Sequence, residues 1–258
     1  MASDAKVSDP NFMLSLARGL GVLRAFEGNS TLSVAETARL SGLSRPSASR
    51  CLYTLRCLGY VREAGGRFSL TPKLLPLAAG FLTSTPLASA SQAVVNTLRD
   101  QLQETFSVGS LDPTDPGRII YIARAERNQV IAAPLMVGST LPSHCTSMGR
   151  VLLASLAPPL FENWLSDTSL DARTARTITS AAEFRAELHA VREQRWSLVE
   201  EELEAGLRSL AVPVRDRDGN VVAALNVATF SNAYSRTHLI DELLPALRAA
   251  AAQLERAI

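Results

Sequence analysis

Two capped helix starts lie close together near the N-terminus, and they constrain the fold more than any other feature of the chain. Ser33 and Glu36 have the spacing of a capping box, in which each side chain bonds the other residue's backbone amide. Gly42 tolerates the positive φ of a tight turn, and Ser44 with Pro46 begins another helix. The pattern predicts a short helix over 34–40 and a second from 44 to about 58.

The flanking segments extend this pattern into a small domain. An apolar stripe that includes Leu16, Leu20 and Phe26 predicts a helix over about 13–26. Two strand-like runs, 60–62 and 67–70, flank a glycine-containing turn and predict a hairpin. The order helix, helix, turn, helix, hairpin is a winged helix-turn-helix layout. We predict such a domain over residues 12–71; a generic small α+β domain is the alternative.

The exposed face of the second helix of the motif would carry contacts to double-stranded DNA. Arginine pairs bidentately with guanine, serine bonds phosphates or base edges, and Arg67 at the hairpin would meet a phosphate or the minor groove. The predicted DNA-binding residues are Ser44, Arg45, Ser47, Ser49, Arg50, Tyr53 and Arg67. Any one of them could instead be an ordinary solvated residue.

The charge distribution agrees with an anionic partner for the N-terminal part only. Residues 1–75 contain 10 Lys/Arg and 5 Asp/Glu, whereas residues 76–258 contain 16 Lys/Arg and 20 Asp/Glu, although the net charge of the whole chain is only +1. A basic unit followed by a mildly acidic one favours nucleic-acid binding by the first.

The remaining 173 residues, 86–258, predict an α+β or α/β domain that follows a linker helix over 72–85. Residues 216–220 are a highly specific sequence signal for a hairpin turn, which would join two strands. The expected helices span about 87–106, 147–156, 158–165, 181–195 and 236–258, and the expected strands span 107–111, 119–125, 129–137, 209–215 and 221–229.

Several function classes lack support. The sequence has no Gly-x-Ser-x-Gly elbow, phosphate loop or His-Glu-x-x-His motif, so no catalytic residue is predicted and the chain is not expected to be an enzyme. Its three cysteines fit neither a disulfide framework nor a zinc pattern, so no metal or cofactor is expected. Because no secretion signal or run of roughly 20 apolar residues is found, we expect a cytoplasmic protein without membrane contact.

Two segments of the second domain are candidates for ligand binding. A loop rich in small polar residues runs into a helix at Thr146 and Ser147, and the free amides of a helix start favour an anion such as a carboxylate. The run 200–204 contains four glutamates, which form either a solvated turn or a polar wall of the same pocket. A capped helix without ligand is the alternative for the first segment.

These segments resemble the IclR family of bacterial transcription regulators over nearly the whole chain. The resemblance rests on residues 15–20, on Gly42–Arg50, and in the second half on Leu141–Pro142, Cys145–Ala154, Glu201–Ser209 and Ala223–Val227. The residues of these motifs are most similar to those of the branch that controls protocatechuate, 4-hydroxybenzoate and β-ketoadipate catabolism.

The resemblance implies a winged-helix DNA-binding head and a GAF-like effector domain, assembled as a homodimer and then as a dimer of dimers. It also implies a pocket for a small organic acid. Met148, Glu200, and Asn226 or Ala228 stand where relatives often have a small residue, Asp and a strand serine, respectively. The implied effector residues are Leu141, His144, Thr146, Ser147, Met148, Glu200, Ser209, Asn226 and Ala228.

The sequence therefore predicts a regulator that binds an operator and responds to an aromatic or dicarboxylic acid. Three alternatives stay open at this stage. The effector belongs to another class, such as glyoxylate-like acids, sugars or multidrug ligands; the chain is an enzyme with a DNA-binding head; or it is a DNA binder without a ligand.

Overall fold

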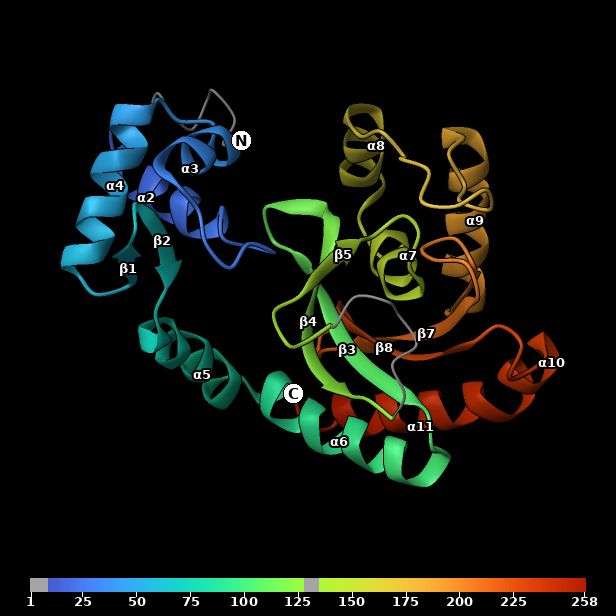
Figure 1. Cartoon of the computed structure of the whole chain (residues 1–258). Helices are drawn as coiled ribbons and strands as arrows, with labels where there is room; N and C mark the ends of the chain where they lie inside the picture. Colours follow the sequence, from blue (N-terminus) through green and yellow to red (C-terminus); the bar gives the residue numbers. More distant parts are fainter. Residues whose placement is uncertain (1–8, 128–134) are drawn as a thin grey trace. The chain divides into compact units, whose positions relative to one another are not determined.

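The computed structural model describes residues 9–127 and 135–258. They form two compact units, the first ending at Gly80 and the second extending from Phe81 to Ile258 (Figure 1). The division falls within helix α5 (Leu75–Ser84), which follows a single 3₁₀ turn at Pro72–Leu74. The predicted linker segment 72–85 is therefore helical over most of its length.

The first unit contains the predicted helix-turn-helix and its hairpin. Helices α2 (Leu14–Arg24), α3 (Val34–Ser41) and α4 (Arg45–Cys57) precede strands β1 (Val61–Ala64) and β2 (Arg67–Leu70). Both side chains of the Ser33–Glu36 capping box make their bonds, and the Ser44 hydroxyl accepts from the Ser47 amide at 3.4 Å. Gly42 has φ +67°. The winged helix-turn-helix prediction is confirmed.

Only part of the apolar stripe predicted for the first helix is buried. Phe26, just after the helix, is buried with Val22 and Leu52 in the core of the first unit. In contrast, Leu16 and Leu20 are 58% and 54% exposed. The stripe predicted from the period is therefore wider than the core of this unit can cover.

The second unit is built on one antiparallel sheet of order β5-β4-β3-β8-β7-β6. Its strands are β3 (Thr105–Asp112), β4 (Asp115–Ala125), β5 (Thr140–Pro142), β6 (Ser197–Glu200), β7 (Leu207–Arg215) and β8 (Val221–Phe230). The β7–β8 connection is the predicted turn at 216–220, where the Asp216 carboxylate accepts the amides of Asp218 and Asn220. Antiparallel pairing lets short hairpins join the neighbouring strands.

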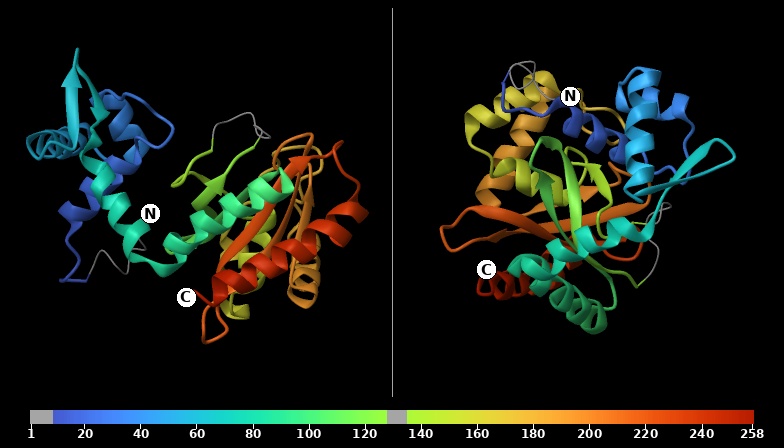
Figure 2. Two further views of the ribbon diagram at one scale, coloured as in Figure 1. Left: turned by 90° about the horizontal axis from the view of Figure 1, so that it is seen from below. Right: turned by 90° about the vertical axis from the view of Figure 1, so that its left-hand side faces the viewer.

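Helices cover both faces of this sheet (Figures 1 and 2). Helices α6 (Pro86–Leu102) and α11 (Leu244–Glu255) lie side by side on one face, which we call the α11 face. The opposite face, which we call the α7 face, is covered by helices α7 (Ser147–Ala154), α8 (Pro158–Asp167) and α9 (Ala181–Gln194). Side chains alternate between the faces along each strand.

Some element boundaries differ from the predictions, for identifiable reasons. Helix α6 ends at Leu102 rather than near 106, because Gln103 adopts the left-handed conformation and Phe106 is buried in the sheet. The last helix is interrupted at Leu239–Leu243 by a π turn, where Pro245 removes a backbone donor. Strand β6 was not predicted, because, unlike the equally short β1 and β2, it does not flank a two-residue glycine turn that indicates a hairpin.

The predicted strand over 129–137 lies mostly outside the described residues. Its described part, 135–137, is not a strand; the short strand β5 follows instead. Among the described residues no single helix is long and apolar enough to cross a membrane, and only the interrupted pair 72–84 and 86–102 meets the length and composition criterion together.

Candidate functional site

The outer face of α4 presents a continuous set of polar side chains. Arg45, Ser49 and Tyr53 recur every fourth residue, so they lie on one side of the helix, and all three are exposed. Arg50 is also exposed beside them. Ser44 and Ser47 lie at the start of the helix, where their hydroxyls bond each other at 3.0 Å. Six of the seven predicted DNA-binding residues therefore share one helix and its cap.

Arg67 is placed differently from the other predicted DNA contacts. Its guanidinium bonds the Thr31 hydroxyl and the Thr31 carbonyl, each at 3.0 Å, and pairs with Glu36 at 3.1 Å. These bonds fix the hairpin to the start of α3. Capping by Ser33 is the main cause that lowers the pKa of the Glu36 carboxyl, and Arg67 adds to it. The side chain thus has a structural role in this unit.

The N-terminal end of α7 supplies polar atoms to the α7 face of the sheet. The Thr146 hydroxyl caps the helix by accepting from the Gly149 amide at 3.3 Å, and it donates to the Pro142 carbonyl at 2.9 Å. The next residue, Ser147, is 1% exposed, and its hydroxyl has no hydrogen-bond partner among the described residues. Met148 packs over the backbone of Gly109.

A row of polar side chains crosses the sheet beneath this helix start. The strand register pairs Arg124 with Ser107 and Ser107 with Asn226, so the three side chains share the α7 face on β4, β3 and β8. Asn226 is 5% exposed, and its Oδ1 has no partner in the described part of the chain. Burying unpaired polar atoms costs about 1–3 kcal/mol each, which indicates a missing polar partner.

Arg124 is the only basic member of this row. Its side chain is 6% exposed; it donates to the Ser107 hydroxyl at 3.1 Å and pairs with Glu126 at 2.9 Å. Its Nε has no hydrogen-bond partner within the described ranges, and its guanidinium lies 5.9 Å from the Tyr121 ring centre. Burial raises the pKa of Tyr121 to about 12, so the phenol stays protonated. The sequence patterns did not single out Arg124.

An apolar patch adjoins the polar row. Ser209 pairs with Ala228 across β7 and β8, one step along the strands from Asn226. Ala228 is buried against Leu207, and Leu135 and Leu203 pack on them. Leu141 packs against the cluster under α7. Polar groups at one end and apolar groups at the other suit a small amphipathic molecule.

His144 and Cys145 do not form a reactive pair. The His144 ring nitrogen Nε2 lies 3.0 Å from the Asp171 carbonyl, and burial lowers the pKa of the imidazole. Burial raises the pKa of the Cys145 thiol to about 11, so the thiol is protonated at neutral pH. His144 is thus bonded to the segment between α8 and α9. In the described ranges no group of His, Cys, Asp and Glu side chains is arranged to hold a metal ion.

The glutamates of the run 200–204 make different contacts. Glu200 pairs with Arg208 and Arg236, each at 2.8 Å, and it lies on the α11 face because its neighbour Val199 occupies the opposite one. The structure therefore places Glu200 away from the polar row. Glu202 is buried and pairs with Arg150 at 2.5 Å.

Gly149 lies so close to a neighbouring loop that no side chain fits there. A Cβ on Gly149 would lie 2.1 Å from the Ser143 carbonyl oxygen. We expect Gly149→Ala to destabilise the second unit by about 3 kcal/mol, because the backbone must move to relieve the overlap. Urea unfolding of the full chain measures this loss. Gly80→Ala, in open space, is the control and should not destabilise; equal losses for both variants would contradict this prediction.

Comparison with known proteins identifies the chain. It matches the IclR helix-turn-helix domain over residues 15–65 and the C-terminal domain of the bacterial transcriptional regulator IclR over residues 79–256. The chain belongs to the IclR family of bacterial transcriptional regulators. This agrees with the predicted family and with the two units of the structure.

Two curated relatives of this IclR-family chain have named regulatory roles. It is 42% identical to the Pca regulon regulatory protein of Pseudomonas putida, over 98% of this chain and 89% of that protein. It is 34% identical to the p-hydroxybenzoate hydroxylase transcriptional activator of Acinetobacter baylyi, over 99% of this chain and 96% of that protein. Both relatives are regulators, as predicted, and neither is named as an enzyme.

A solved effector-binding domain of a relative is also similar to this chain. The inducer-binding domain of a PobR double mutant from Acinetobacter, solved with 3-hydroxybenzoic acid, superposes with a TM-score of 0.61 and 34% identity. The match covers 65% of this chain and 97% of that one.

Proposed function

We propose that this IclR-family regulator changes its DNA binding in response to a small aromatic carboxylic acid, of which 4-hydroxybenzoate and protocatechuate are the first candidates. The named roles of the relatives and the 3-hydroxybenzoic acid bound to the PobR domain support an aromatic effector. A cytoplasmic location accords with this role. In this proposal residues 12–71 bind DNA and residues 86–258 bind the effector. Residues 72–85 link these two domains.

The observation that carries the proposal is the buried polar row on the α7 face. Arg124 offers a cation, and the unpaired atoms of Ser147 and Asn226 offer a donor and an acceptor. An aromatic acid has a carboxylate for the arginine, a ring for the apolar patch, and a phenol for the polar atoms. Glyoxylate, a candidate from the sequence, has no ring to cover Ala228 and Leu207.

In the proposed effector site, Thr146, Ser147 and Met148 lie above the row, Ser209, Asn226 and Ala228 lie in the sheet, and Leu141 and His144 lie at the margin. Met148 restricts the space above Gly109 and so favours a flat ligand. Glu200 is left out, since its carboxylate is engaged on the α11 face.

In the DNA-binding unit, Arg45, Ser49, Arg50 and Tyr53 would face the major groove, with Ser44 and Ser47 at the helix start near the phosphates. Arg67 would support DNA binding indirectly, by holding the β1–β2 hairpin against the start of α3. Duplex sites selected from random DNA with the full-length protein would provide the probe. Arg45→Ala and Arg50→Ala should each weaken such a site by about tenfold or more, whereas Arg39→Ala on the exposed surface of α3 should not.

Isothermal titration of the full-length protein with 4-hydroxybenzoate, protocatechuate, benzoate and glyoxylate tests the effector class. We expect saturable binding of at least one phenolic acid and a change in the affinity for the selected DNA site. The effector must bind the two states of the protein with different affinity, or DNA binding would not change. Binding of glyoxylate alone would reject the aromatic class, and no binding of any acid would reject the effector site.

We further propose that the first unit mediates homodimer formation, the first step to a dimer of dimers. Leu16 and Leu20 on α2, and Leu75 and Leu77 on α5, are each more than half exposed, and exposed apolar patches of this kind mark interaction surfaces. We expect Leu16→Glu with Leu20→Glu to weaken dimerisation by at least about 100-fold. Sedimentation of this variant and of a Leu40→Glu control measures it; an unchanged dimer would contradict the assignment.

A further inference from the structure

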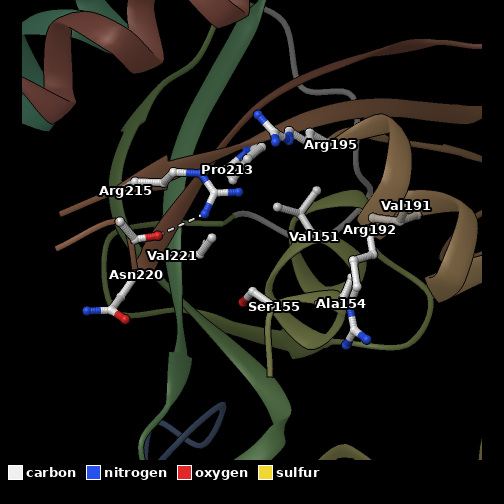
Figure 3. Close-up of a pocket in the computed structure, with 11 residues that line it drawn as sticks. Val151, Ala154, Ser155, Val191, Arg192, Arg195, Pro213, Arg215, Asn220 and Val221 are labelled. Atoms are coloured by element: carbon white, nitrogen blue, oxygen red, sulfur yellow. Dashed lines mark hydrogen bonds between the residues drawn. The ribbon is translucent and has the colours of Figure 1, made fainter. Parts of the chain in front are cut away.

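A cavity of about 310 Å³ opens at the C-terminal end of α7 (Figure 3). Val151, Ala154 and Ser155 line it from this end of the helix, whereas Ser147 and Met148 of the proposed effector site lie at the N-terminal end. The other walls come from α9 and the β7–β8 hairpin. The cavity is therefore a separate place from the polar row.

Three arginines line this cavity: Arg192, Arg195 and Arg215. In Figure 3, Arg195 and Arg215 lie on one side with Pro213 between them, and Arg192 lies beside Ala154 on another. Arg192 donates to the carbonyls of Ala154 and Leu156 at 2.7 and 3.1 Å. Arg215 donates to the Gly219 carbonyl at 2.9 Å. Neutral carbonyls thus hold two of the guanidiniums, and all three arginines remain accessible to solvent, since Arg192 and Arg195 are exposed and Arg215 is half-buried.

None of the three forms an ion pair with a carboxylate in residues 9–127 and 135–258, although Arg124, Arg150 and other arginines of this unit do. Two acidic side chains next to Arg215 make other hydrogen bonds. Glu255 accepts the backbone amide of Arg215 at 2.9 Å, and the Asp216 carboxylate accepts the amides of the turn. Because this half of the chain has more acidic than basic residues, the cluster is not a consequence of general basicity.

The backbone of Arg195 is in a conformation that favours glycine. It ends α9 with φ +62° and ψ +36°, where a side chain adds strain. Glycine would fit this position without strain, so the structure keeps an arginine at a cost. An observed strained residue beside a cavity is a reason to look for a function.

The apolar walls and the volume of the cavity limit the size and the chemistry of a ligand. Val151, Val191 and Val221 give it apolar walls, and a second cavity of about 290 Å³ adjoins it through Ser155, Asn220 and Val221. A volume near 300 Å³ is at the small end for ligand sites. Guanidiniums from more than one side of the cavity suit a molecule with more than one negative charge.

We propose that this cavity binds a small organic anion that carries at least two carboxylate or phosphate groups, at a site distinct from that of the aromatic acid. The shared chemistry is a compact dianion or trianion, which the arginines hold by charge-assisted hydrogen bonds. Citrate represents the carboxylates and pyrophosphate the phosphates.

Titration calorimetry of the full-length protein with citrate and with pyrophosphate, at constant ionic strength, tests this site. We expect saturable binding of at least one probe, and a weakening of about tenfold in Arg195→Gln and in Arg215→Gln. Arg195→Gly should lose binding to the same extent and yet unfold at no lower temperature, because it removes the strain. Arg256→Gln, which removes an equal charge from an exposed residue that does not line the cavity, should bind as the wild type does.

The proposal is overturned if neither probe binds, or if Arg256→Gln weakens binding as much as Arg195→Gln and Arg215→Gln. Binding of 4-hydroxybenzoate should be unchanged in the Arg195 and Arg215 variants. This second titration separates the two sites, since failure of either leaves the other measurable.

Discussion

Replacing Arg124 with methionine is expected to weaken the binding of 4-hydroxybenzoate about 100-fold. The guanidinium is buried, fixed by Ser107 and Glu126, and keeps its Nε free of a hydrogen-bond partner in the described ranges. A ligand carboxylate would complete its bonds, and charge-assisted bonds of this kind are worth about 1.5–3 kcal/mol each. Methionine matches the aliphatic part of the arginine side chain, and Glu126 is 38% exposed and remains hydrated. The fold is therefore expected to persist.

Isothermal titration with the acid and with the neutral amide, 4-hydroxybenzamide, separates recognition from structure. Arg124→Met should lose most of the preference for the acid and little of the affinity for the amide. Arg127→Met removes an exposed charge three residues further along the chain and should change neither. Equal weakening of acid and amide by Arg124→Met would show that the residue shapes the site without binding the carboxylate.

Replacing Arg150 with methionine is expected to destabilise the second unit by roughly 3–5 kcal/mol. The side chain is 2% exposed, pairs with Glu202 at 2.5 Å and Glu187 at 3.3 Å, and donates to the His144 carbonyl at 2.9 Å. It therefore joins α7, α9, the 200–206 segment and the loop before α7. Methionine would fill much of the volume but leave the buried Glu202 carboxylate without its cation.

Urea unfolding of the full chain, followed by a probe in the second unit, measures the loss. Arg150→Met with Glu202→Met should recover a large part of the stability, because no charge is then buried without a partner. Arg185→Met, which breaks the exposed pair of Arg185 with Glu162 at 2.7 Å, is the matched control and should change stability little. A loss for Arg150→Met no larger than that for Arg185→Met would contradict the prediction.

The first unit follows closely from local sequence. The Ser33–Glu36 box, Gly42 and Ser44 act on their own few residues, so their effect does not depend on distant segments. Arg45, Ser49 and Tyr53 need only the helical period to share a face. What this reasoning could not find is the bonding of Arg67 to Thr31, a residue 36 positions away.

The effector site depends on contacts between distant residues. The start of α7 was readable from Thr146 and Ser147, because a helix cap is local. Arg124, Ser107 and Asn226 come from three strands and meet only through the sheet register. The alternation of side chains along β6 also decides that Glu200 faces away from the row, and a shift of one residue would reverse that face.

The winged helix-turn-helix, the family, the turn between β7 and β8, and the polar start of α7 were all predictable from the sequence alone. These features arise from caps, glycines and turns whose energies are set within a few residues. The partners of the charged side chains depend on the tertiary structure. The buried Arg150 pairs with Glu202, and the buried Arg124 pairs with Glu126 but has no partner for its Nε among the described residues. Arg195 and Arg215 lie beside a cavity. Burial and strand pairing join residues far apart in the chain, and no local pattern encodes their partners.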